Sequence, residues 1–146
     1  MAGVIAYAKF YYSHFYTAHV RYHHKTVATF EDATTARMNE SVIAFFIRGI
    51  PGKMIEAWNF NSHKRHSWLS LQNEMLKHLA LYIAIFSGIT FIFGLRAGIF
   101  SLTQGAFCAL MIEIVNYVEH YGLERKQDLS NGFYEPVNLR HSWNAP

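Results

Sequence analysis

Histidines occur at two places in the chain where their spacing suits metal binding. The segment His19-Val20-Arg21-Tyr22-His23-His24 carries three imidazoles in six residues. Positions i and i+4 lie on one face of a helix, so His19 and His23 are predicted to bind one metal ion together. His24 lies about 100° further around such a helix, where it is expected to reach a second ion or a neighbouring helix. Imidazole nitrogens suit zinc, iron, copper or nickel. Three surface histidines beside a membrane are the alternative interpretation.

The second place is Asn116-Tyr117-Val118-Glu119-His120-Tyr121-Gly122-Leu123, at the polar end of a long apolar segment. His120 is the predicted metal ligand, and Glu113, Asn116 and His120 share one helical stripe because they are spaced i, i+3 and i+7. A carboxylate within an apolar span costs about 2.5–3.5 kcal/mol on insertion scales, so Glu113 should face protein interior and have a partner. The alternative role of Glu113 is a hydrogen bond that only holds helices together.

Several neighbours are predicted to support the ligands without binding the metal. Asn116 lies one turn before His120 and is expected to orient its ring. The full supporting set is Glu113, Asn116, Glu119 and Tyr121. The other histidines lack ligand-like spacing and are interpreted as interface or loop residues: His14, His63, His66, His78 and His141. The single cysteine, Cys108, allows no intrachain disulfide.

The composition indicates a membrane protein. The chain of 146 residues is 51% hydrophobic and 16% charged, whereas an ordinary soluble domain is about 25% charged. This length predicts a single domain. The net charge of +3 is small and the basic residues are scattered, a pattern that does not favour nucleic acid as a partner.

Two apolar runs within residues 76–120 predict a transmembrane helical hairpin. They cover Leu79 to Phe93, extended by Leu76, and Ile99 to Val118, each near the ~20 residues that cross a bilayer. Residues 94–98 read as the turn. A short link makes the helices antiparallel neighbours, and small residues are expected to let them approach closely: Gly88, Gly105, Ala106 and Ala109.

The rest of the chain is predicted to be helical or polar loop, which makes the class all-α. An aromatic helix over Gly3 to Ala18 leads into the histidines, so residues 1–24 form one unit. An interfacial segment over 39–58 begins with an amphipathic helix, Asn39 to Ile50, that Pro51-Gly52 should stop. The polar stretches are predicted loops: 59–70 and 121–146, with a turn at Asn131-Gly132.

Charge at the flanks predicts an orientation for the hairpin. Lys64, Arg65 and Lys77 precede it and Arg125 and Lys126 follow it, while the turn has only Arg96. The positive-inside tendency therefore places both open ends, and His120 with them, on the cytoplasmic or matrix side. The mitochondrial inner membrane is one compatible setting.

The quoted motifs resemble those of the integral-membrane alkane monooxygenases (AlkB type), which are relatives of membrane fatty-acid desaturases and hydroxylases. HVRYHHKTVATFEDATTARMNES, residues 19–41, is similar to the second histidine box of that family and the stretch that follows it. NYVEHYGLERK, NGFYEPV and HSWNA, which begin at residues 116, 131 and 141, resemble its Asn-Tyr-x-Glu-His-Tyr-Gly-Leu box and the His-Ser-Trp-Asn run. The resemblance covers nearly the whole chain.

The resemblance implies a fold, a cofactor and a reaction. The fold is part of a bundle of six transmembrane helices with a cytoplasm-facing cluster of histidines that holds two non-haem irons. The reaction is terminal hydroxylation of alkanes or similar chains with O₂ and electrons from a rubredoxin-like donor. Carried over by position, the iron ligands are His19, His23, His24 and His120. The aromatic helices are expected to line a slot for the hydrocarbon.

The chain also departs from the family pattern. The first box, of His-Glu-x-x-His type, is expected upstream of Met1, and the last box, of Leu-Gln-Arg-His-x-x-His-His type, is expected after Pro146. Ala18 stands where the family usually has a carboxylate. Of the nine ligands in the family, this chain carries four. Four imidazoles are too few to hold two irons rigidly.

Three functions are compatible with these departures. The chain is one piece of a split or truncated hydroxylase, or a non-catalytic subunit of a larger membrane assembly such as a mitochondrial respiratory complex, or a metal protein with another role. Alkane 1-monooxygenase activity is expected only if partner chains supply the missing boxes. Obligatory membrane partner chains are expected in each case.

Overall fold

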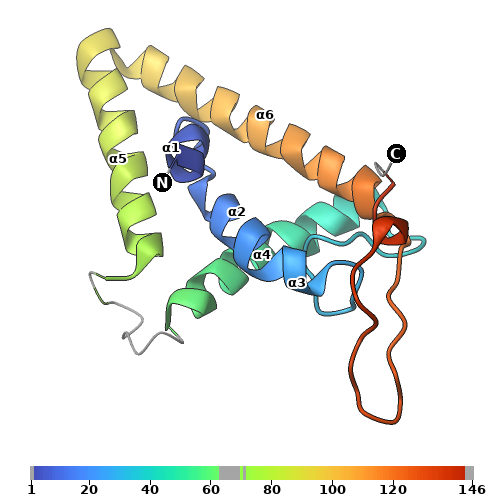
Figure 1. Ribbon diagram of the computed structural model, residues 1–146. Helices are drawn as coiled ribbons and strands as arrows, with labels where there is room; N and C mark the ends of the chain where they lie inside the picture. Colours follow the sequence, from blue (N-terminus) through green and yellow to red (C-terminus); the bar gives the residue numbers. More distant parts are fainter. Residues whose placement is uncertain (1, 63–69, 71, 144–146) are drawn as a thin grey trace.

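Every regular element in the described part of the chain is a helix. The structure, a computed structural model, describes residues 2–62, 70 and 72–143 (Figure 1). The predicted all-α class is confirmed. The elements are α1 (Ala2–Ala8), α2 (Ser13–Ala18), the π-helix η1 (His19–His23), α3 (His24–Thr26), α4 (Val42–Ser62), α5 (Glu74–Phe93), α6 (Leu95–His120) and the 3₁₀-helix η2 (Leu139–His141).

The helices α5 and α6 form the predicted transmembrane hairpin. With 20 and 26 residues, they are the two described helices that are long and apolar enough to cross a membrane. Gly94 alone separates them, with φ 87°, a conformation that glycine adopts without steric cost. The predicted turn over 94–98 is therefore too long, because residues 95–98 already belong to α6.

The two membrane helices diverge from their junction, and α1 and α2 lie in the opening between them (Figure 1). The prediction that Gly88 and Gly105 bring α5 and α6 together is wrong. A Cβ at Gly88 would meet nothing within 4 Å, whereas a Cβ at Gly105 would lie 2.7 Å from Tyr11 Cδ2 and 3.0 Å from the Phe10 carbonyl oxygen. Gly105 thus makes room for the N-terminal segment.

The N-terminal helix is broken, although we predicted one helix over Gly3 to Ala18. The break separates α1 from α2, and Tyr11 within it has φ 55°. Its hydroxyl lies 2.8 Å from Ser101 Oγ on α6. Packing against α6 fixes this bend, and such a tertiary contact overrides local helix preference.

The helix α4 runs through Pro51, so the prediction that Pro51-Gly52 ends it is wrong. Close packing on residue 33 accounts for this. A Cβ at Gly49 would lie 2.9 Å from the Ala33 carbonyl oxygen, and one at Gly52 would lie 2.8 Å from Ala33 Cβ. The helix also includes residues 59–62 of the predicted polar loop. Residues 63–69 of that loop, with His63 and His66, lie outside the described residues.

The described residues after α6, 121–143, form a long loop that contains the short helix η2. An isolated antiparallel bridge joins Gln127 and Tyr134, and Gly132 in the predicted turn has φ 74°. The loop projects away from the helices and returns through η2 to the end of α6 (Figure 1). Its return places His141 beside His120.

Candidate metal centre

Four imidazole rings from two distant segments gather at one place. The ring centroids of His19 and His23 are 5.0 Å apart, and those of His23 and His120 are 4.7 Å apart. His24 is 4.7 Å from His19 and 5.9 Å from His23. The structure therefore brings together every histidine that the sequence singled out as a ligand.

The π-helical turn explains why His24 joins this cluster. In a π-helix the hydrogen bonds run from i to i+5, so residues four and five positions after His19 both lie beneath it. An α-helix would have turned His24 away, and the prediction that it points toward a second ion or another helix assumed that geometry. The observed η1 gathers all three histidines of this segment on one side.

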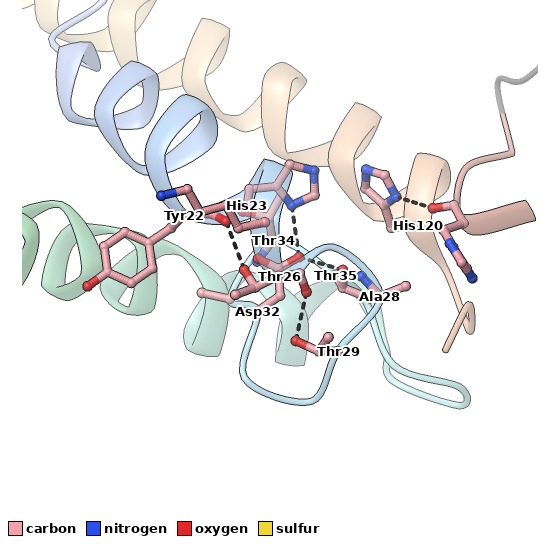
Figure 2. A network of polar contacts seen from close by, with 12 residues as sticks. Tyr22, His23, Thr26, Ala28, Thr29, Asp32, Thr34, Thr35 and His120 are labelled. Atoms are coloured by element: carbon pink, nitrogen blue, oxygen red, sulfur yellow. Dashed lines mark hydrogen bonds and ion pairs between the residues drawn. The ribbon is translucent and has the colours of Figure 1, made fainter. Parts of the chain in front are cut away.

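The ring of His23 is oriented by a buried carboxylate. His23 Nδ1 lies 2.8 Å from Asp32 Oδ2 (Figure 2), and the two residues are only 3% and 1% exposed. A carboxylate accepts but does not donate, so Nδ1 carries the proton and Nε2 keeps its lone pair. Burial tends to raise the pKa of Asp32, but the hydrogen bonds from His23 and Thr35 hold that pKa below its usual value. Asp32 is therefore an ionised acceptor.

The ring of His120 is oriented by a backbone carbonyl. His120 Nδ1 donates to the His141 carbonyl oxygen at 3.0 Å (Figure 2), which again leaves Nε2 with its lone pair. The carbonyl is held in place by a capping box, in which Asn138 Oδ1 accepts from Arg140 N and His141 Nδ1 accepts from Asn138 N. The η2 turn thus fixes the ring at the end of α6.

His19 is half-buried and neutral. Burial, reinforced by the neighbouring His23 and His24, lowers its pKa to about 4. Its Nδ1 is buried and has no hydrogen-bond partner in the described part of the chain. A neutral imidazole with an unpaired nitrogen beside other imidazoles is suited to a metal, since metals bind the neutral form.

A cavity of about 220 Å³ adjoins the cluster. Besides the four predicted ligands it is lined by Glu119, His141 and Ser142, among others. Glu119 Oε1 lies 3.8 Å from His120 Nε2 and accepts a hydrogen bond from Ser142 Oγ at 3.3 Å. Glu119 is therefore next to the cluster, where it was expected.

A buried ion pair anchors α6 to the rest of the protein. Glu113 is fully buried and accepts hydrogen bonds from Lys53 Nζ on α4 and from the Tyr12 hydroxyl beside α2. The prediction that Glu113 faces the interior and has a partner is confirmed. Because Asn116 and His120 are also buried, the predicted stripe is the face by which α6 packs. This anchor sets the register at which His120 meets η1.

Two supporting residues make contacts other than those expected. The His120 Nδ1 contact that we expected from Asn116 comes from the His141 carbonyl, and Asn116 Nδ2 is buried without a partner in the described residues. The hydroxyl of Tyr121 accepts from the backbone N–H of Asn39 at 3.1 Å. Tyr121 therefore holds the loop before α4 in place by this hydrogen bond.

Sequence reasoning missed two residues of the site, Asp32 and His141. Asp32 lies in a loop, and only the fold brings its carboxylate to His23. His141 was interpreted as a loop residue, yet it is 5% exposed and lines the cavity. The Asn138 and His141 spacing of a helix-capping box was a usable signal for an ordered turn there. His14 and His78 are also buried but do not line this cavity.

The residues present fit a partial imidazole site for a metal such as iron. His23 and His120 both commit Nδ1 to an oxygen acceptor, so the Nε2 atoms are available as donors. Metal-binding histidines typically have this arrangement. Within the described ranges, no three His, Cys, Asp or Glu side chains are already arranged to share one ion. The cluster therefore offers imidazole nitrogens to a metal without forming a coordination shell among the described residues.

Comparison with known proteins identifies the family of the chain. A family model described as fatty acid desaturase matches residues 3–146. The alkane 1-monooxygenase of Ectopseudomonas oleovorans is 38% identical over 138 residues, which cover 92% of this chain and 34% of that protein. The alkane 1-monooxygenase 2 of Pseudomonas aeruginosa is 36% identical over 148 residues, covering 99% of this chain and 39% of that protein.

A more distant relative is the xylene/toluene monooxygenase hydroxylase component XylM of Pseudomonas putida. It is 27% identical over 132 residues, covering 87% of this chain and 34% of that protein. The chain thus spans only 34% to 39% of the length of these three relatives. The family match nevertheless extends over almost all of the chain. The chain belongs to the fatty acid desaturase family, as a member of its alkane-monooxygenase type.

Proposed function

We propose that this chain supplies one histidine face of a membrane non-haem iron site that hydroxylates alkyl chains with O₂. The observation that carries the proposal is the meeting of His23 and His120, from η1 and the end of α6, with ring centroids 4.7 Å apart. The names of the relatives, alkane 1-monooxygenase and xylene/toluene monooxygenase, support the reaction class. Non-haem iron bound there would supply O₂ activation for insertion of oxygen into a C–H bond.

The residues of this chain have separate tasks in the proposed site. His19, His23, His24 and His120 offer imidazole nitrogens to the metal, and the buried pair of Lys53 and Glu113 keeps α6 in register with α4. The apolar surfaces of α5 and α6 face lipid, the phase in which an alkyl substrate is concentrated. We propose that the chain acts as one partial membrane domain, with the cluster at the cytoplasmic or matrix end.

Four imidazoles do not complete a site for two irons, so we propose that other membrane polypeptide supplies the remaining ligands. The open side of the cluster is the 220 Å³ cavity beside Glu119 and His141. A histidine-bearing segment placed there would complete the donor set. A rubredoxin-like protein is the proposed source of electrons.

The test is an oxygen-labelling experiment on the assembly purified from native membranes. With ¹⁸O₂, an alkane and a reducing system, we expect label in a terminal alcohol, and iron that co-purifies with the chain. His23→Ala should abolish the label and lower the iron content while the assembly remains intact. An intact assembly that contains this chain but neither iron nor label would instead indicate a non-catalytic subunit.

A further inference from the structure

Asp32 is a buried carboxylate that contacts the His23 ring of the histidine cluster. It is 1% exposed, and its Oδ2 accepts from His23 Nδ1 at 2.8 Å and from Thr35 Oγ1 at 2.5 Å. Its Oδ1 accepts from the backbone N–H of Thr34 at 3.1 Å. Figure 2 shows the carboxylate below the His23 ring, with a dashed line between them. These hydrogen bonds therefore hold the Asp32 carboxylate in place beside the His23 ring.

Hydrogen bonds hold the loop that carries Asp32 against the segment that follows α6. The Thr35 hydroxyl accepts from the backbone N–H of Ala28 at 2.9 Å while donating to Asp32. The Ala28 carbonyl accepts from Arg125 N at 2.7 Å, and the Ala36 carbonyl accepts from Gly122 N at 2.9 Å. Residues 122 and 125 directly follow α6. The loop therefore joins the support of His23 to the segment that follows His120.

The two oriented rings differ in the charge of their acceptors. His120 donates to a neutral carbonyl, whereas His23 donates to a carboxylate. A carboxylate behind a metal-bound imidazole fixes its tautomer and raises its basicity, and loss of such a partner typically costs about 10–100-fold in metal affinity. Inside a protein of low dielectric this effect is stronger than in water.

We propose that Asp32 is a positioning residue, which holds His23 in the Nε2-presenting form and strengthens its bond to the metal. This inference rests on the proposed function, because it requires a metal at His23. Asp32 does not line the cavity beside the cluster, so it acts only through the imidazole. Removing His23 should therefore remove the effect of Asp32 as well.

The experiment is a double-mutant cycle on metal affinity. The assembly that contains the full 146-residue chain, purified from native membranes and stripped of its metal, is titrated with Co²⁺, and the ligand-field absorption and the Kd are recorded. The variants are Asp32→Asn, His23→Ala and their combination. Asp32→Asn keeps the shape of the side chain and removes its charge. The matched control is Asp128→Asn, an exposed carboxylate that also accepts several hydrogen bonds, in the distal loop.

We expect Asp32→Asn to weaken Co²⁺ binding about 10–100-fold and to shift the absorption band, while Asp128→Asn changes neither. In the His23→Ala background, the additional effect of Asp32→Asn should fall below about twofold, since the pair acts as one unit. Equal weakening in both backgrounds would reveal a merely structural role and overturn the inference. Unchanged affinity in Asp32→Asn alone would overturn it while leaving the proposed function intact. A wild-type assembly that binds no Co²⁺ would overturn both.

Discussion

Single residues show which parts of the site depend on local spacing and which depend on the fold. The i, i+4 spacing of His19 and His23 correctly placed those rings together. The proximity of His24 depended on a π-helical turn, which the spacing alone does not reveal. Asp32 reaches His23 because Ala28, at φ 58°, turns the chain back after η1. Such a contact between a helix and the following loop has no periodic sequence signal.

The raised pKa of the half-buried Glu56 side chain can be tested by the pH dependence of stability. Burial raises the pKa of Glu56 to about 7 from a model-peptide value of 4.5. Between those pH values folded Glu56 binds more protons than unfolded Glu56, so the contribution of Glu56 to stability falls as pH rises through this window. Glu56→Gln keeps an acceptor for Ala33 N, which now donates to Glu56 Oε1 at 3.1 Å, and stays neutral. We expect this variant to lose that pH dependence.

The measurement for Glu56 is the thermal unfolding midpoint in detergent across that pH window. Glu31→Gln, which removes an exposed carboxylate from the neighbouring loop, is the control and should retain the wild-type slope. A Glu56→Gln protein whose midpoint has the same pH dependence as the wild-type midpoint would contradict the assignment.

At the scale of elements, composition predicted the membrane hairpin but not how its helices pack. The apolar runs were long enough to define α5 and α6. Their divergence follows from the N-terminal segment at Gly105, which is a tertiary contact. The continuation of α4 through Pro51 has the same kind of cause, because Gly49 and Gly52 pack against Ala33. Local helix rules therefore failed where backbone segments approach closely.

The ion pair between α4 and α6 provides the first test at this scale. Glu113→Gln leaves the Lys53 ammonium buried without a counter-charge, which typically costs about 3–5 kcal/mol. We expect a large drop in the unfolding midpoint with normal membrane insertion. The double variant Glu113→Gln with Lys53→Met should recover most of the loss, because replacing both charges is often nearly neutral. Failure of the double variant to recover would contradict this account of the anchor.

The close packing of α4 on Ala33 provides a second test at the scale of elements. Gly49→Ala places a methyl group 2.9 Å from the Ala33 carbonyl oxygen, and overpacking of this kind costs about 1–3 kcal/mol. The matched control is Gly88→Ala on α5, where the new methyl group meets nothing within 4 Å. Alanine is favoured over glycine in helices by about 0.8–1.0 kcal/mol, so this variant should be neutral or more stable. Equal stability of the two variants would show that α4 does not pack as described.

At the scale of the whole molecule, the hairpin must place its turn and its histidine end on opposite sides of the bilayer. We expect a cysteine introduced at Gly94 and one introduced at Ser130, each in a Cys108→Ala background, to react with membrane-impermeant reagents from opposite sides. The basic flanks predict that Ser130 lies on the cytoplasmic or matrix side. Labelling of both positions from the same side would contradict a membrane-spanning hairpin.

The family and the four candidate histidines followed from sequence motifs, whereas the arrangement of the site required the fold. Neither motif contains both halves of the cluster, and only the anchored register of α6 brings His120 to η1. The long loop after α6 had no predicted role, yet its η2 turn supplies the carbonyl that orients His120. Those contacts join segments far apart in the sequence, which periodicity does not report.

The most direct test of the central claim is the metal content of the His120→Ala assembly compared with that of a His78→Ala assembly. The two residues are matched, since both are helical and only 4% and 5% exposed. We predict that His120→Ala removes bound iron while the chain remains inserted, and that His78→Ala retains wild-type iron. Unchanged iron in the His120→Ala assembly would contradict a metal centre built from η1 and the end of α6.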